Sequence, residues 1–216
     1  MQITLIGGSG GMGTFILEEF VSRGHEIRAV VRRPEAVSAE ALVKPVRADV
    51  YDMAEVTEAL TGADVVVSAF NPGWNEPDLY GKYLRGARNI QAAAVAAGCA
   101  RLLVIGGAAS LYGNDGRQLI EAFTPPEPYA SGVRAARDYY EEIRTETRLD
   151  WTYLSPPMDC GPNGPDGRTG HYRTGTDHPV ADADGKSSLS RQDLAVAVVD
   201  EIEHPAYLRQ RFTVGY

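Results

Sequence analysis

Five glycines lie within the segment 7–13, near the start of the chain. Gly8, Gly10 and Gly13 have the spacing G-x-G-x-x-G, while Gly7, Gly10 and Gly13 have the spacing G-x-x-G-x-x-G. Glycine tolerates positive φ angles and close backbone approach, and the N-terminus of a following helix offers unpaired N–H groups and partial positive charge. This segment therefore predicts a turn that binds a diphosphate. The candidate contacts are Gly7, Gly10, Gly11, Met12 and Gly13.

Two adjacent arginines, Arg32 and Arg33, follow the next apolar run at 26–31. Sites for NAD usually place an acidic residue here to bind the ribose 2'-hydroxyl, whereas sites for NADP place an arginine near the 2'-phosphate. A guanidinium offers forked donors to phosphate, so the pair favours NADP(H). The nearby Glu35 is compatible with NAD(H) as the cofactor. Alternatively, the two arginines are solvated loop residues that bind no cofactor.

Three further positions follow apolar runs that would end at the same edge of a sheet. Asp49, followed by Val50, is either a partner for the adenine amino group or a residue that caps the backbone. Its spacing does not separate these two roles. Gly106 and Ser155 are expected to complete the cofactor contacts, because ligands of open α/β sheets bind outside the carboxyl ends of the strands.

The loop after the valine-rich run 64–69 carries aromatic and polar groups. Phe70 and Asn71 are expected beside the ribose and the nicotinamide of a bound dinucleotide. Trp74 is either a stacking surface for a flat substrate or an aromatic side chain packed over the loop. This loop is therefore predicted to form part of the cofactor and substrate site.

The apolar pattern indicates how these groups are positioned. Short apolar runs and amphipathic segments alternate along the chain, as is typical of parallel sheets covered by helices. We therefore expect an α/β fold of the Rossmann type, a doubly wound parallel sheet of about seven strands whose first and fourth strands flank the switch point. The predicted strands include 3–6, 26–31, 43–47, 64–69, 101–106 and 212–214, and the predicted helices are 14–23, 51–60, 79–98, 129–147 and 190–203.

Capping residues mark several of these helices. Asp52 and Ser190 are predicted N-caps, because their side chains can accept hydrogen bonds from unpaired backbone N–H groups. Gly24 is in a position to end the first helix. The segment 156–189 is dense in Gly, Pro and polar residues, which predicts a lid-like substrate loop.

Composition limits the functions that the chain can have. At 216 residues and 44% hydrophobic content, residues 1–216 are expected to form one domain. A net charge of -8 disfavours binding to nucleic acid, since phosphates would be repelled. Two cysteines, Cys99 and Cys160, have no metal-type spacing, so no metal site is expected. No apolar run is long enough to span a bilayer, and we expect a cytoplasmic monomer or homodimer without a membrane partner.

The glycine turn, the arginines and the later pairs Tyr112-Gly113 and Pro128-Tyr129 resemble the short-chain dehydrogenase/reductase superfamily. The resemblance implies that Ser110 polarises a substrate carbonyl and that Tyr129 transfers a proton. It also implies a lysine four residues after the tyrosine, where this chain has Val133. The standard alcohol-dehydrogenase mechanism is therefore not expected.

The C-terminal third is similar to the atypical members of this superfamily that are described as NADH-flavin reductases, and in outline to biliverdin reductase B. The motifs that carry the likeness are 154–157, 167–173, 190–195 and 209–216. The resemblance implies hydride transfer from NADP(H), or NAD(H), to a flavin or quinone-like acceptor, with flavin as a substrate and not a prosthetic group. A non-catalytic NmrA-like redox sensor is the alternative. An epimerase or dehydratase is disfavoured by Val133 and by the short C-terminal region.

Overall fold

The computed structural model describes residues 1–162 and 164–216, which contain eight strands and six helices. The strands are β1 (Ile3–Ile6), β2 (Ile27–Val31), β3 (Val43–Arg47), β4 (Val65–Ser68), β5 (Arg101–Ile105), β6 (Asp150–Ser155), β7 (Arg173–Gly175) and β8 (Gln210–Gly215). The helices are α1 (Gly13–Ser22), α2 (Met53–Leu60), α3 (Leu79–Ala96), α4 (Leu119–Ala122), α5 (Ala130–Ile143) and α6 (Arg191–Glu203). Two short 3-10 turns, η1 (Pro34–Ala36) and η2 (Ala108–Ser110), follow β2 and β5.

The strands form one sheet in the order β3-β2-β1-β4-β5-β6-β8-β7. Ile3 of β1 is paired in parallel with Ile27 of β2 on one side and with Val65 of β4 on the other. The first and fourth strands therefore flank the switch point, which confirms the predicted Rossmann-type sheet. The predicted strand ranges included neither β6 nor β7, and β7 pairs antiparallel with β8 at the edge. A strand of three residues is too short to show an alternating pattern.

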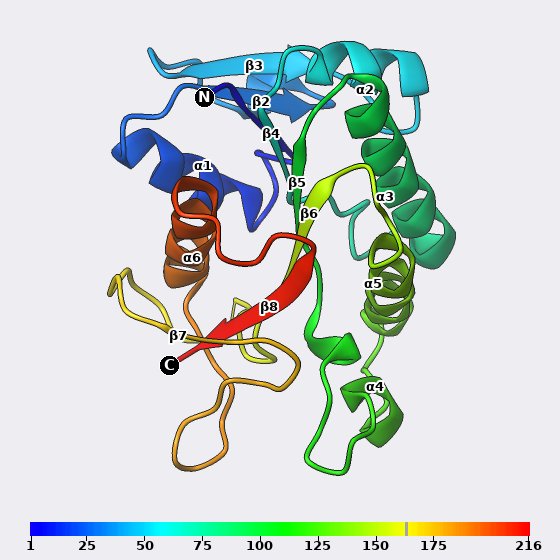
Figure 1. Ribbon diagram of the computed structural model, residues 1–216, viewed down its shortest axis with the longest axis vertical. Coiled ribbons are helices and arrows are strands. Elements are labelled where there is room, and N and C mark those ends of the chain that lie inside the picture. Colours follow the sequence, from blue (N-terminus) through cyan, green and yellow to red (C-terminus); the bar gives the residue numbers. More distant parts are fainter. Residues whose placement is uncertain (163) are drawn as a thin grey trace.

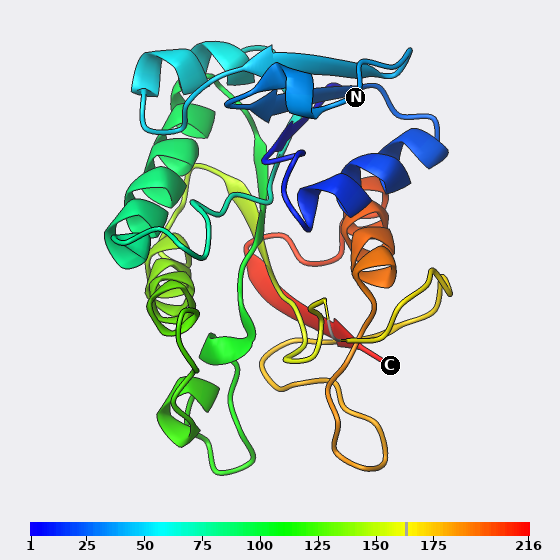
Figure 2. The same ribbon diagram turned by 180° about the vertical axis from the view of Figure 1, so that it is seen from behind.

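Helices cover both faces of the sheet. In Figure 1, α1 and α6 lie on one side, while α2, α3 and α5 lie on the other, and Figure 2 shows the same two layers from behind. The central strand β4 supplies both cores, because Val65 and Val67 pack towards α1 and α6 while Val66 packs towards α3 and α5. This two-sided burial explains the nearly continuous run of valines.

The predicted caps are present. Asp52 accepts hydrogen bonds from the backbone N–H groups of Ala54 at 2.9 Å and Glu55 at 3.1 Å, and Ser190 accepts one from Asp193 at 3.0 Å. Gly24 follows α1 with a φ of 81°, which is the left-handed conformation expected of a glycine that ends a helix.

Helix α5 ends earlier than predicted, at Ile143 instead of residue 147. The carboxylate of Glu146 accepts hydrogen bonds from the backbone N–H groups of Thr147 at 2.9 Å and Arg148 at 2.7 Å. These bonds give the backbone an alternative to the helical ladder, which explains why the helix stops.

The segment predicted as a lid is tied to the rest of the chain at several points. It contains β7, which extends the sheet, and it contacts α1 and α6 through side chains described below. Asn163 falls inside the predicted lid and lies outside the described residues. Of the helices in the described ranges, none is both long and apolar enough to cross a bilayer.

Candidate functional site

The glycine turn is drawn tightly between β1 and α1. Gly7 has a φ of 83°, and a Cβ at that position would lie 2.8 Å from the carbonyl oxygen of Ala69. A Cβ on Gly13 would lie only 2.0 Å from the carbonyl oxygen of Gly7. The backbone N–H of Gly10 donates to the carbonyl oxygen of Gly7 at 2.9 Å. Glycine is therefore required at Gly7 and Gly13, and the start of α1 is held against the end of β1.

The first turn of α1 presents free backbone donors. Met12 is the N-cap and provides no side-chain cap. Within the described part of the chain, the N–H groups of Gly11 and Met12 donate to no protein acceptor. Unpaired N–H groups and the positive end of the helix dipole form a site for an anion. Diphosphate binding at this turn stays a prediction.

Arg32 and Arg33 are exposed at the carboxyl end of β2. Neither forms an ion pair with any residue that the structure describes. Burial and the nearby Asp49 raise the pKa of Tyr51, and the positive charge of Arg32 opposes that rise. A hydrogen bond from Lys82 lowers the pKa of Glu76, and Arg32 acts in the same direction. Arg32 therefore lies near the start of α2 and the loop after β4, with its guanidinium available to a ligand.

Asp49 caps the backbone and retains acceptor capacity. Its Oδ1 accepts a hydrogen bond from the Tyr51 N–H at 3.0 Å, which is the backbone-capping role predicted as one of two. Its Oδ2 accepts no hydrogen bond among the described residues, so the adenine role stays a prediction. Val50 is buried, and its carbonyl oxygen accepts a hydrogen bond from the Asn89 side chain at 2.9 Å. Val50 therefore anchors the turn to α3.

The loop after β4 begins with two anchored residues. The Phe70 ring packs edge-on against Tyr51, with ring centroids 6.2 Å apart, and lies 6.1 Å from the ring of Tyr83. A Cβ on Gly86 would lie 2.4 Å from the Phe70 ring, so this glycine makes room for it. The Oδ1 of Asn71 accepts a hydrogen bond from the Gly73 N–H at 2.7 Å. Phe70 and the turn at Asn71 are thus held in place after β4, and their contacts with a cofactor stay predictions.

Gly106 and Ser155 lie at the carboxyl ends of the neighbouring strands β5 and β6. A Cβ on Gly106 would lie 1.9 Å from the Tyr153 ring, so only glycine fits. The hydroxyl of Ser155 is fully buried and has no hydrogen-bond partner, as is also true of its register partner Thr213 on β8. Buried polar atoms are usually paired, so the Ser155 hydroxyl at this edge is suited to a ligand.

The two predicted catalytic side chains have opposite environments. Ser110 is 0% exposed, whereas Tyr129 is 45% exposed at the start of α5. The two arginines on the first turns of α5 are engaged elsewhere, Arg134 with Ser131 and Arg137 with Asp138. No lysine or arginine of the described chain donates to the Tyr129 hydroxyl. The catalytic roles of Ser110 and Tyr129 stay predictions.

Arg211 is the hydrogen-bond partner of Ser110, and no role was predicted for it from the sequence. Its guanidinium is buried and donates to the carbonyl oxygen of Ser110 at 2.7 Å and to its Oγ at 3.2 Å. It also forms an ion pair with Asp177 and lies 4.4 Å from the centre of the Tyr140 ring. The one signal in the sequence is a charged residue inside an apolar strand. Its partners lie far away in the sequence and could not be inferred from it.

Three of the C-terminal motifs meet at Asp193, which is fully buried. Its carboxylate accepts hydrogen bonds from the Thr169 N–H at 2.9 Å, the Thr169 hydroxyl at 2.5 Å and the Gly170 N–H at 2.8 Å. The Tyr216 hydroxyl donates to it at 2.6 Å. Burial alone would raise the pKa of Asp193, but these donors lower it. The carboxylate is therefore the anchor of the predicted lid.

A second anchor joins the same segment to α1. Arg168 donates to both carboxylate oxygens of Glu19, at 2.8 and 2.9 Å, and Arg23 donates to Glu19 at 2.8 Å. The hydrogen bond from Arg168 is the largest influence that lowers the pKa of Glu19. The segment thus rests on α1, whose first turn carries the anion site.

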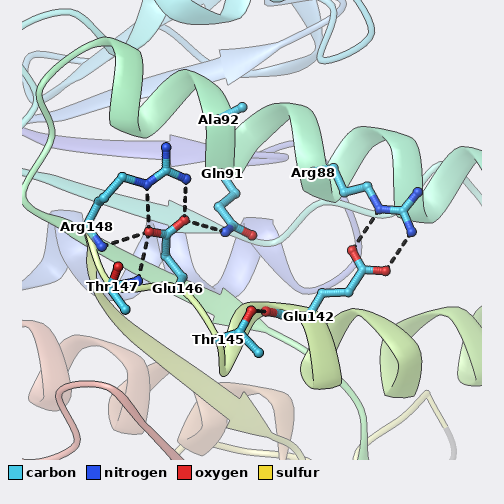
Figure 3. A pocket seen from close by; sticks show the side chains of 8 residues that line it. All are labelled: Arg88, Gln91, Ala92, Glu142, Thr145, Glu146, Thr147 and Arg148. Carbon is cyan, nitrogen blue, oxygen red and sulfur yellow. Dashed lines mark hydrogen bonds and ion pairs between the residues drawn. The ribbon is translucent and has the colours of Figure 1, made fainter.

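A hollow on the surface lies away from this site. It has a volume of about 400 Å³ and lies between the C-terminal ends of α3 and α5, beside the amino end of β6 (Figure 3). Arg88 of α3 pairs with Glu142 of α5 at 2.6 Å across the hollow, and Arg148 pairs with Glu146 at 2.8 Å within the loop that follows α5. A hydrogen bond from Arg148 is the largest of the causes that lower the pKa of Glu146 to about 2. Its polar groups therefore satisfy one another.

Comparisons with known proteins agree with this geometry. Residues 7–205 match the model of a family described as NAD(P)H-binding. The chain is 34% identical to the uncharacterized protein YwnB of Bacillus subtilis (strain 168) over 216 residues, covering 99% of this chain and 98% of YwnB.

Two crystal structures are also similar over the full chain. A candidate epimerase from Bacteroides thetaiotaomicron is 39% identical with a TM-score of 0.91, covering 100% of this chain and 96% of that one. A candidate NADH-flavin reductase from Streptococcus pneumoniae is 29% identical with a TM-score of 0.85, covering 100% and 99%. From the glycine turn, the sheet order and these matches, we conclude that the chain belongs to the NAD(P)H-binding family.

Proposed function

We propose that this protein is an NAD(P)H-dependent reductase that transfers a hydride to a flavin or a quinone-like acceptor. The observation that carries the proposal is the contrast between the two halves of the site. The turn at Gly7 and Gly13 is built for a dinucleotide, whereas Tyr129 has Val133 where a lysine would assist it. A flat redox acceptor needs little acid–base help from the protein.

The residues present fit a nicotinamide dinucleotide. The free N–H groups of Gly11 and Met12 suit its pyrophosphate, and the unpaired Arg32 and Arg33 suit a 2'-phosphate. The orphaned hydroxyl of Ser155 offers a buried hydrogen-bonding group further along the edge. This set of donors favours NADP(H) over NAD(H).

Bound at this site, the reduced nicotinamide supplies the hydride. The chain's own residues bind and orient the two reactants. Phe70 and the turn at Asn71 form a wall of the site, and Gly106 makes room for the Tyr153 ring beside the end of β5. Tyr129 is exposed and able to donate a hydrogen bond to the acceptor. We place this activity in the cytoplasm, in a monomer or a homodimer, with flavin as a substrate.

The activity itself is the first test. Purified protein mixed with NADPH and with FMN, riboflavin or a quinone should oxidise NADPH. The absorbance of the reduced nicotinamide should therefore fall. Absence of turnover with every acceptor, together with tight NADPH binding, would contradict a reductase and favour the NmrA-like sensor. A sensor would bind a partner protein with different affinity in the oxidised and reduced cofactor states. An epimerase would convert its substrate without net consumption of the cofactor.

Arg32→Ala should weaken NADPH binding selectively. Loss of a charged hydrogen bond to the 2'-phosphate is expected to cost about 1–3 kcal/mol, with NADH affinity nearly unchanged. Titration of each cofactor by calorimetry measures both values. Arg144→Ala, which removes an exposed arginine paired with Glu141 at 3.0 Å, is the matched control. Equal losses for NADPH and NADH would assign Arg32 a structural role.

A further inference from the structure

An exposed aromatic pair lies beside the proposed site. The rings of Trp74 and Tyr129 meet edge to face, with centroids 5.0 Å apart and planes at 72°. Each residue is 45% exposed. Large aromatic side chains are buried when they serve only the core, so two that contact each other at the surface need an explanation.

The Trp74 ring packs closely against α5 at Gly132. A Cβ on Gly132 of α5 would lie 2.8 Å from Cζ3 of the Trp74 ring and 3.1 Å from the Leu79 side chain. The turn before it is fixed by the hydrogen bond that the Gly73 N–H donates to the Oδ1 of Asn71. The indole is thus held against α5 by its neighbours, while much of its surface stays open. This combination is typical of a preorganised recognition surface and not of a loop side chain in solvent.

The fold places this pair at the edge of the sheet where the parallel strands have their carboxyl ends. Trp74 belongs to the loop that follows β4, and Tyr129 precedes α5, which packs against η2 after β5. Strands β4 and β5 are neighbours, so both aromatic residues come from segments near their carboxyl ends. Ligands of open α/β sheets bind at this edge. The pair is therefore close to where an acceptor meets the dinucleotide.

We propose that Trp74 and Tyr129 form the platform on which the ring system of the acceptor stacks, and that they select an extended flat ring of the isoalloxazine class. This inference rests on the proposed reductase function and names its substrate class. Trp74 is 45% exposed, so part of the indole is open to offset stacking, and the area gained grows with the number of fused rings. A single-ring quinone covers less of the indole and gains less.

Steady-state kinetics test this platform. Trp74→Ala should raise the KM for FMN and riboflavin by roughly tenfold or more, because a stacking partner is lost. The rise for a single-ring quinone should be smaller, and the affinity for NADPH should not change. Trp74→Phe should restore most of the flavin KM, since it keeps an aromatic face. Phe123→Ala, which removes a ring that is 37% exposed on another segment, is the control.

Binding without turnover separates this inference from the proposed function. The chain has two tryptophans, and Trp151 is buried with its Nε1 donating to the carbonyl oxygen of Glu146 at 3.2 Å. In Trp74 variants, Trp151 fluorescence should still report flavin binding through energy transfer. Riboflavin is titrated into protein saturated with NADP⁺, and its Kd should rise roughly tenfold in Trp74→Ala.

The outcomes have distinct meanings. Flavin turnover in the wild type with an unchanged KM and Kd in Trp74→Ala would overturn the platform and leave the reductase standing. Equal loss of NADPH and flavin binding in Trp74→Ala would show a structural role and also overturn it. Absence of turnover in the wild type, with riboflavin binding that depends on Trp74, would contradict the reductase and support the platform.

Discussion

Gly13→Ala is expected to destabilise the protein and to impair dinucleotide binding together. The added Cβ would lie 2.0 Å from the carbonyl oxygen of Gly7 and 2.9 Å from the Cα of Gly8, so α1 must move away from β1. Overpacking of this kind lowers the free energy of unfolding by about 1–3 kcal/mol. The same movement displaces the free N–H groups of Gly11 and Met12, and NADPH affinity should fall by at least roughly tenfold.

Chemical denaturation and cofactor titration measure the two effects of Gly13→Ala. Gly11→Ala is the matched control for folding, because a Cβ at Gly11 meets no atom within 4 Å. Its free energy of unfolding should change by less than about 0.5 kcal/mol. If Gly13→Ala leaves stability and NADPH affinity unchanged, the close contact between α1 and β1 does not hold the site.

Asp193→Ala is expected to be the most destabilising substitution in the C-terminal half. It removes the acceptor for the N–H groups of Thr169 and Gly170 and for the hydroxyls of Thr169 and Tyr216. The acceptor is fully buried and its donors are partly buried, so the loss of all four hydrogen bonds is expected to cost about 3 kcal/mol in total. Denaturant unfolding measures the loss, and hydrogen exchange should show faster exchange at Thr169 and Gly170.

An exposed carboxylate provides the control for Asp193. Asp166 accepts a hydrogen bond from the Gln192 side chain at 2.8 Å on the exposed surface. Asp166→Ala should change the free energy of unfolding by less than about 0.5 kcal/mol. Similar effects of Asp193→Ala and Asp166→Ala would show that the hydrogen bonds to Asp193 do not anchor the segment.

The lowered pKa of Asp193 also predicts a pH dependence. A group whose pKa is lower in the folded state stabilises the protein above its unfolded pKa, about 4 for an aspartate, and loses this effect as pH falls through the folded pKa. The stability difference between the wild type and Asp193→Asn should therefore be constant from neutral pH to about pH 4 and shrink below it. A constant difference at every pH would contradict a charged Asp193.

Residues with local roles could be predicted well from the sequence. Asp52 and Ser190 cap their helices as expected, because an N-cap bonds to N–H groups two or three residues away. Asp49 was left with two roles, and the structure shows the backbone bond to Tyr51. Its adenine role depends on a ligand, which no local pattern could decide.

The environments of the predicted catalytic residues could not be predicted from their neighbours in the sequence. Ser110 was placed at the carboxyl edge of the sheet, where η2 lies, but its hydrogen-bond partner is Arg211 from the last strand. The two residues are separated by about half of the chain. A strand partner at that distance is chosen by the sheet order, which no short motif encodes.

The sequence by itself determined the glycine turn and the alternation of strands and helices. It also determined that two arginines directly follow the second strand. These features depend on neighbours within a few residues, where steric limits and hydrogen-bond reach leave few alternatives. Only the tertiary structure decided that Asp193 accepts hydrogen bonds from Thr169 and Tyr216, and that Trp74 packs against Gly132. Those contacts join segments brought together by the packing of helices on the sheet, so their geometry exists only once the whole chain has folded.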